Sequence, residues 1–443
     1  MAQPLNMVDN AWLAMDSSTN LMMITGVLVF ETPLALDALR ATVERRMLRF
    51  EHFTMKLAGR DGHLCWERDP EFNIRAHLHR VALPAPAGQA ELQELASDLM
   101  STPVDMRRPL WQFHLIEDFQ GGSALIARIH HTVGDGMALV QVLLSLTDDS
   151  PAPAAQLPVA PAARRPARSV VSIAADGRAL IDDPAKIAAA ADLAGKGALA
   201  LAKLLFLPPD TPNLFRGRLG VEKRAAWSRP IALDDVKLVG RLTRGTVNDV
   251  LINAVVGALR RYLLRHGEAV DGRNIRAIVP VNLRPPDVPL TELSNKFGVI
   301  FLDLPIGIAD PFDRLLEIRR RTDAIKGSPE ALVAFGLLNT IGALPEPAAN
   351  LAIELFASKV TAVMTNVPGP RQPIYLAGSR IRQVLFWVPQ SGKLGLGVSI
   401  FSYAGEVTVG IATDTGLVPD PETIAEDFAA EFESLAALAR AVA

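Results

Sequence analysis

The chain has 443 residues, of which 49% are hydrophobic, and its mean hydropathy is +0.21. This length predicts two domains rather than one core. A formal net charge of −3 without a long basic tract argues against a nucleic-acid-binding protein. No window holds about 20 uninterrupted apolar residues, so no membrane-spanning helix is expected. Residues 1–4 lack the pattern of an export signal and Cys65 is the only cysteine, so we expect a cytoplasmic protein without intramolecular disulfides.

Residues 1–148 predict alternating strands and helices. Apolar residues recur at helical spacing along Leu36–Arg49, and a second helix is expected around Glu91–Met100. Leu21–Phe30 and Gln112–Glu117 read as strands, because apolar and β-branched residues dominate both stretches. The first part of the chain is therefore expected to be an α/β unit.

A seven-residue run, His130-His131-Thr132-Val133-Gly134-Asp135-Gly136, follows the strand-like residues 124–129 and precedes a helix-like stretch. Gly134 and Gly136 let the backbone turn tightly at this corner, and Asp135 can cap the helix or hold another group. Because side chains alternate across a strand, His130 and His131 are expected to point to opposite faces.

One imidazole of this run is suited to general base catalysis. Its ordinary pKa of ~6.5 lets it accept a proton from a hydroxyl that attacks a carbonyl, and then return that proton to the leaving group. No covalent intermediate is then required, so the arrangement suits direct acyl transfer between two bound substrates. The alternative is a pair of structural histidines with an aspartate cap.

The composition changes after Asp149. Residues 151–168 are dominated by proline and alanine and predict an extended linker. Ala185–Leu207 is rich in alanine and leucine with few lysines, and predicts a helix. That helix suits either shallow insertion at a membrane or lipid-droplet surface, or packing between the two halves of the protein.

The second half, residues 211–443, carries its own series of elements. Thr246 is a candidate N-cap for a helix over Val250–Arg265, and Asp249 in the first turn suits the helix dipole. A buried strand over Ile275–Leu283 ends at Arg284. Further helices, strands and a closing helix follow this strand, at Pro311–Lys326, Glu330–Leu344, Pro347–Ser358, Thr361–Asn366, Leu394–Tyr403, Glu406–Asp414 and Pro421–Ala441.

The run from His130 to Gly136 resembles the HHxxxDG signature of the CoA-dependent acyltransferase superfamily. Within it, the chain most resembles bacterial wax ester synthase/diacylglycerol acyltransferases, over nearly its whole length. The narrower resemblance includes a short aromatic helix before the first strand and the motifs Pro109-Leu110-Trp111, Asn248-Asp249, Asn295-Lys296-Phe297-Gly298 and Val367-Pro368-Gly369-Pro370.

This resemblance implies an α/β (α+β) fold. Two chloramphenicol-acetyltransferase-like domains are expected, each a mixed sheet flanked by helices, with an active-site channel at their interface and His131 at its midpoint. The expected boundaries are 1–148 for the N-terminal domain, 149–210 for the linker and amphipathic crossover helix, and 211–443 for the C-terminal domain.

The resemblance also assigns roles to residues. His131 is the implied general base, and His130 precedes it in the active-site run. Asp135, which Gly136 follows, is mainly architectural and is paired with Arg284. We expect that pair to be a bidentate ion pair that fixes the histidine loop. Residues implied along the substrate channel are Pro109, Leu110, Trp111, Asn248, Asp249 and Asn282. Candidate donors to the oxyanion are Asn282, Thr365, Asn366 and Ser399.

The implied activity is transfer of a long-chain acyl group from acyl-CoA to a fatty alcohol or diacylglycerol, which gives wax esters or triacylglycerol. No metal and no cofactor are expected, because acyl-CoA is a substrate. Peripheral contact with the inner membrane face or with lipid droplets is expected, and a homodimer is left open. Two alternatives remain: a condensation-type acyltransferase with a carrier-bound or polyketide acceptor, and a non-catalytic lipid-binding protein on the same scaffold.

Overall fold

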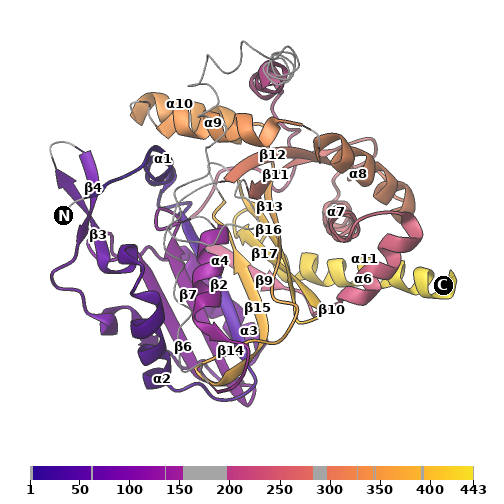
Figure 1. The fold of residues 1–443 in the computed structure, drawn as a ribbon. Coiled ribbons are helices and arrows are strands. Elements are labelled where there is room, and N and C mark those ends of the chain that lie inside the picture. Colours follow the sequence, from indigo (N-terminus) through magenta and orange to yellow (C-terminus); the bar gives the residue numbers. More distant parts are fainter. Residues whose placement is uncertain are drawn as a thin grey trace, which may run out of the picture.

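The computed structural model describes residues 3–60, 63–134, 136–152, 197–282, 297–326, 328–342, 344, 346–390 and 394–442. The predicted roles of Asp135 and Arg284, and nearly all of the proline- and alanine-rich linker, lie outside these residues. Figure 1 shows two sheets side by side, with helices around them and the C-terminal helix on the far side from the N-terminus. No helix in the described part of the chain is long and apolar enough to cross a membrane.

The first sheet belongs mainly to the N-terminal half. Its strand order is β5 (Leu78–Arg80), β6 (Trp111–Phe119), β7 (Gly122–His130), β2 (Met23–Phe30), β15 (Ser379–Trp387), β14 (Tyr375–Leu376) and β8 (Thr147–Asp148). Every residue of β7 and β2 is buried, because both strands are central and covered on both faces. This explains their nearly continuous apolar sequences.

Helices and a small third sheet complete this half. The helices are α1 (Met7–Met15), α2 (Leu36–Thr42) with a π-helical continuation at Val43–Met47, α3 (Gln89–Ser101) and α4 (Gly136–Ser145), with 3-10 turns at Glu51–Thr54 and Ile74–Ala76. The small sheet has the order β1 (Gln3–Pro4), β4 (His63–Arg68), β3 (Met55–Arg60).

The second sheet has the order β10 (Ile231–Ala232), β17 (Glu406–Asp414), β16 (Leu396–Tyr403), β13 (Ala362–Pro368), β11 (Ile275–Asn282) and β12 (Phe297–Leu304), with β9 (Lys223–Trp227) also on β17. The helices of this half are α6 (Leu233–Thr243), α7 (Val247–Arg265), α8 (Pro311–Lys326), α9 (Glu330–Gly342), α10 (Glu346–Ala357) and α11 (Pro421–Val442).

The first sheet contains strands from both halves of the sequence. Strands β14 and β15 come from the C-terminal half of the sequence, yet β15 pairs antiparallel with β2, from Thr25 opposite Trp387 to Phe30 opposite Ile381. The two halves therefore share a sheet. The physical reason is that β2 still has a free edge after pairing with β7, and β15 satisfies its backbone groups there.

Residues 197–206 form a helix, as predicted for the end of the crossover segment. One face packs into an apolar cluster with α9, β12 and β13, through Leu204. Its last carbonyls, those of Leu204 and Leu205, accept hydrogen bonds of 2.7 and 2.6 Å from the buried ammonium of Lys359. A cation at a helix C-terminus is favourable because the helix dipole is negative there.

Candidate active site

Backbone hydrogen bonds fix the predicted histidine loop to two neighbouring segments. The N–H of His130 donates to the carbonyl of Leu110 (2.9 Å), and the N–H of His131 donates to the carbonyl of Met22 (2.8 Å). The chain then turns, and the N–H of Val133 donates to the carbonyl of His130 (3.0 Å). Helix α4 begins at Gly136, so the loop is the predicted strand-to-helix corner.

His130 makes a local polar network. Its Nδ1 accepts hydrogen bonds from the backbone N–H (3.2 Å) and the hydroxyl (2.8 Å) of Thr132. An accepting Nδ1 places the ring proton on Nε2, which faces Oδ1 of Asp16 at 3.8 Å. That same carboxylate oxygen accepts the backbone N–H of Met22 at 2.7 Å. These contacts give His130 the role of holding the loop.

The ring of His131 stacks on the indole of Trp12 from α1, with centroids 3.9 Å apart and planes at 24°. Trp12 packs with Val8, Met22 and Phe335, the last from α9. His131 is only 4% exposed. The sequence predicts an open channel beside this ring. In the structure, α1 packs against α9 and holds the indole of Trp12 over the imidazole instead.

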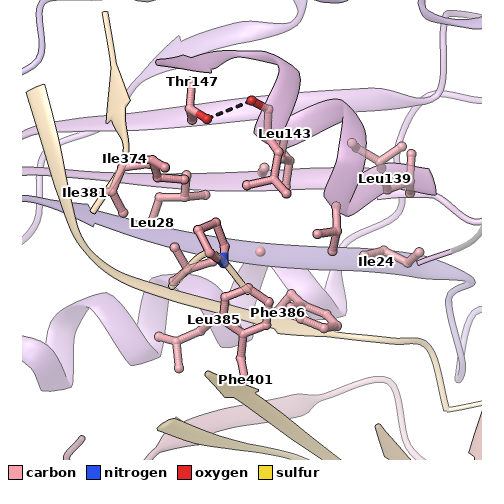
Figure 2. A pocket seen from close by; sticks show the side chains of 17 residues that line it. Ile24, Leu28, Leu139, Leu143, Thr147, Ile374, Ile381, Leu385, Phe386 and Phe401 are labelled. Carbon is pink, nitrogen blue, oxygen red and sulfur yellow. Dashed lines mark hydrogen bonds between the residues drawn. The ribbon is translucent and has the colours of Figure 1, made fainter. Parts of the chain in front are cut away.

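An apolar pocket extends along α4 (Figure 2). Two of its lining residues, Ile24 and Ile129, are next to Met23 and His130 along β2 and β7, close to the histidine loop. The pocket encloses about 640 Å³ of space, counted out to its open mouth, and lies against strands β2, β7 and β15. Among the described residues that line it, Thr147 alone has a polar side chain, and its hydroxyl donates to the carbonyl of Leu144 at 2.7 Å. The lining residues are Ile24, Gly26, Leu28, Ala127, Ile129, Leu139, Val140, Leu143, Leu144, Thr147, Pro370, Ile374, Ile381, Val384, Leu385, Phe386 and Phe401. We call it the α4 pocket.

A second, more polar pocket includes the first residues of β2. It is lined by Asn20, Leu21, Met23, Thr25, Met100, Lys223, Val388, Pro389 and Gln390. Lys223 is held by Asp414 in a buried ion pair of 2.6 Å. The two pockets contain successive residues of β2, Met23 and Ile24, whose side chains point to opposite faces of the sheet. Neither pocket is lined by His131.

Residues Pro109, Leu110 and Trp111 position the loop and do not line either pocket. Leu110 supplies the carbonyl that fixes His130, and Trp111 is fully buried with its indole N–H donating to the carbonyl of Phe53 at 2.9 Å. The rigid core around this motif therefore holds the end of β7 in place.

Asn248 and Asp249 lie at the start of α7. Asp249 is fully buried in a capping box, in which Oδ2 accepts the Thr246 N–H at 2.8 Å and Oδ1 accepts the Thr322 hydroxyl at 2.7 Å. Asn248 accepts a 2.8 Å hydrogen bond from the amide of Asn366 on β13. These contacts of Asp249 hold the start of α7, and the Asn248–Asp249 pair ties α7 to α8 and β13.

The other candidates lie on neighbouring strands of the second sheet. Thr365 and Ser399 are buried and paired across β13 and β16, where the threonine hydroxyl donates to the serine oxygen at 3.2 Å. Asn282 ends β11, and its side chain is outside what the structure describes, as are Asp135 and Arg284. The predicted Asp135–Arg284 ion pair stays a prediction.

Sequence reasoning missed a buried polar row on the face of β5, β6 and β7 that carries Arg128. His114 stacks on His79 at 5.0 Å, and burial, with smaller effects of His79 and Arg128, lowers the pKa of His114 to about 3. Burial also lowers the pKa of the Arg128 guanidinium to about 10; this group donates to Gln112 and to the Thr102 carbonyl at the C-terminus of α3. The alternation of polar residues along β6 and β7 was the available signal.

Comparisons with known proteins agree with this architecture. Residues 5–251 match the family model "wax ester synthase/diacylglycerol acyltransferase catalytic domain", and residues 293–436 match the C-terminal domain of the same family. A protein of Mycobacterium tuberculosis named as a diacylglycerol O-acyltransferase is 31% identical over 419 residues, which cover 88% of this chain and 80% of that protein. Another, named tgs1, is 30% identical over 81% of this chain and 78% of its own length.

Solved structures show the same fold. A wax ester synthase/diacylglycerol acyltransferase from Marinobacter aquaeolei is similar with a TM-score of 0.74 at 21% identity, covering 99% of this chain and all of that one. The first condensation domain of the calcium-dependent antibiotic synthetase is similar with a TM-score of 0.64 at 14% identity, covering 99% and 96% of the two chains. From the family models and the curated relatives, the chain belongs to the wax ester synthase/diacylglycerol acyltransferase family.

Proposed function

We propose that this acyltransferase moves a long-chain acyl group from acyl-CoA to a fatty alcohol or diacylglycerol, with His131 as the general base. Family membership over most of the chain supports the reaction. The single structural observation that supports the site is the position of His131 in the turn between β7 and α4, two residues after Ile129, which lines an apolar pocket suited to hydrocarbon.

The proposed step needs only the two substrates and one imidazole. His131 removes the hydroxyl proton as the acceptor oxygen attacks the thioester carbonyl carbon. The C–O bond forms, the C–S bond breaks, and the CoA thiolate takes the proton back from the imidazolium. General base catalysis contributes about 10²–10⁴-fold, so alignment of the substrates and stabilisation of the oxyanion must supply the rest. No cofactor enters this scheme.

The α4 pocket suits the hydrocarbon chain of the donor. It runs along a ten-residue helix, which is about 15 Å long, and its lining is almost entirely apolar. A chain lying along α4 would place its carbonyl end at the helix N-terminus beside the histidine loop. The positive end of the helix dipole favours negative charge there, as develops on the thioester oxygen during attack.

The scheme requires both substrates to reach the His131 ring. Trp12 lies flat on the imidazole and the residue is 4% exposed. The indole covers one face of the ring, so in this proposal the two substrates reach the edge of the imidazole while Trp12 stays stacked on it, after elements packed around the loop shift.

We further propose that the enzyme contacts a membrane or lipid droplet through the helix of residues 197–206 and α10. Leu199 and Phe206 are 72% and 85% exposed and lie seven residues apart, on one helical face, and Leu351 and Leu355 form a similar exposed pair on α10. Both elements pack on the same apolar cluster through their inner faces. Figure 1 shows α9 and α10 at one edge of the molecule, next to α1.

The alternatives predict different chemistry. A condensation-type acyltransferase needs a carrier-bound acceptor, and a non-catalytic lipid-binding protein transfers no acyl group. Release of free CoA thiol from palmitoyl-CoA, with hexadecanol or a diacylglycerol as acceptor, separates all three. We expect thiol release and ester formation in the wild type, and loss of both in His131→Ala with an unchanged melting temperature. Activity of His131→Ala within a few-fold of the wild type would reject His131 as the base.

A further inference from the structure

In the middle of the α4 pocket, the two residues that the sheet contributes have very small side chains. Gly26 of β2 and Ala127 of β7 are directly opposite each other in the sheet, and both line the pocket. Larger side chains stand on either side of this pair on the same strands: Ile24 and Ile129 toward the histidine loop, and Leu28 toward the far end. The pocket can therefore extend closer to the sheet at this pair than at either end.

The backbone does not require glycine at position 26. A Cβ added there would have ordinary van der Waals contacts, 3.5 Å to the carbonyl oxygen of Leu385 and 3.8 Å to Cβ of Phe386. Glycine in a strand interior destabilises the strand relative to alanine, so its presence needs another reason. Here glycine relieves no clash, and it is one of the residues that line the pocket.

This space lies where a hydrocarbon chain would pass. The end of the pocket at Ile24 and Ile129 is one residue along each strand from Met23 and His130. The opposite end is at Leu28 and Thr147, beyond the last turn of α4. A long chain that starts at the histidine loop must cross Gly26 and Ala127 to reach that end, whereas a short chain stops before them.

We propose that Gly26 and Ala127 set the longest acyl chain that the enzyme accepts from its CoA donor. This inference rests on the proposed function. The donor brings a single hydrocarbon chain whether the product is a wax ester or triacylglycerol, which matches one pocket along one helix. The donor also carries the carbonyl that the N-terminus of α4 would stabilise. Both arguments assign the pocket to the donor rather than to the acceptor.

The test is a donor series with a fixed acceptor. Gly26→Val and Ala127→Val are assayed by thiol release with octanoyl-CoA, lauroyl-CoA and palmitoyl-CoA, each with hexadecanol. A few added methyl groups in a filled apolar pocket are worth about tenfold or more in kcat/KM. We expect kcat/KM for palmitoyl-CoA to fall by about that factor while octanoyl-CoA stays within about twofold. Leu28→Ala, which lengthens the far end, is expected to shift the preference toward longer donors.

Ala124→Val is the matched control. Ala124 lies on the same strand as Ala127 and is fully buried, but it packs on the opposite face of the sheet and does not line the pocket. Its donor profile should keep the wild-type shape, with the melting temperature of each variant measured alongside. An equal loss for all donors in Gly26→Val, or a changed profile in Ala124→Val, would overturn the inference.

Two further readouts separate this inference from the proposed function. A series of alcohols with palmitoyl-CoA fixed should leave the alcohol preference of Gly26→Val unchanged; a shifted alcohol preference would overturn the assignment to the donor. Binding of palmitoyl-CoA and octanoyl-CoA is also measured by calorimetry in His131→Ala, with and without Gly26→Val. Selective loss of palmitoyl-CoA affinity supports the inference even if His131 has another role, and unchanged affinities for both would refute it.

Discussion

The indole of Trp12 lies parallel to the imidazole of His131, with ring centroids 3.9 Å apart. This contact joins the first helix of the chain to the predicted base, 119 positions later in the sequence. An aromatic face attracts a cation, so it stabilises the imidazolium that forms when a base accepts a proton. Trp12 is therefore a positioning residue for His131 in the proposed mechanism.

Replacing the aromatic face at position 12 should lower turnover. Stacked aromatic pairs contribute about 0.5–1.5 kcal/mol beyond burial, so Trp12→Leu is expected to reduce kcat by roughly 2- to 10-fold. Trp12→Phe keeps a ring and should retain most of the activity. Both variants are compared by kcat, KM and melting temperature. Equal kcat values for the leucine and phenylalanine variants would contradict a role for the aromatic face.

Removing the carboxylate of Asp249 should destabilise the fold without changing the chemistry. Asp249→Asn weakens a buried capping box and the hydrogen bond from Thr322, at a cost of about 1–3 kcal/mol in the free energy of unfolding. Urea unfolding gives this loss, and kcat/KM at low temperature should stay near the wild-type value. Asp234→Asn, at an exposed site in the first turn of α6, is the control and should change stability by less than about 0.5 kcal/mol. A selective loss of kcat/KM in Asp249→Asn would instead place this residue in the substrate channel.

Acid should destabilise the protein through its buried histidines. Burial lowers the pKa of His114 to about 3, so the folded state keeps it neutral while the unfolded chain binds a proton below ~6.5. Stability is thus fully present above the unfolded pKa and is lost as the pH falls from about 6.5 toward 3, by about 1.4 kcal/mol per pH unit for this group. Burial also lowers the pKa of His77 and His79, which adds to the loss.

The variant His114→Gln tests this contribution. Its free energy of unfolding, measured by urea at pH 7, 6 and 5, should depend less on pH than that of the wild type, by up to one proton. An identical pH dependence in the two proteins would show that His114 is protonated in the folded state as readily as in the unfolded chain.

Charges on the exposed apolar surface should weaken lipid binding. Phe206→Glu and Leu351→Glu place a carboxylate at positions that are 85% and 70% exposed, so folding should be unaffected. Sedimentation with phospholipid vesicles should show several-fold weaker binding for the double variant, with unchanged kcat for a short, dispersed substrate pair. Leu242→Glu on α6, which Figure 1 places at the other end of the molecule, is the matched control. Equal vesicle binding by both proteins would reject this surface.

Local sequence patterns determined where several helices, turns and caps of this protein form. The corner at His130–Gly136 follows from an apolar strand, two glycines and a helical repeat, and the cap of α7 follows from Thr246 and Asp249 three residues apart. The sequence has no uninterrupted apolar stretch of about 20 residues, and no helix in the described part of the chain could span a membrane. Both statements depend on the length of apolar runs, which is a local property of the sequence.

Only the tertiary structure decided which distant residues meet. The stack of Trp12 on His131, the pairing of β15 with β2, and the opposition of Gly26 and Ala127 each join segments far apart in the chain. No local periodicity encodes such contacts, because a strand's hydrogen-bonding groups accept any partner strand and its register is set by burial of the whole sheet. The sequence therefore determined the strand-to-helix turn that carries the two histidines, and tertiary packing determined what covers His131 and how large the neighbouring pocket is.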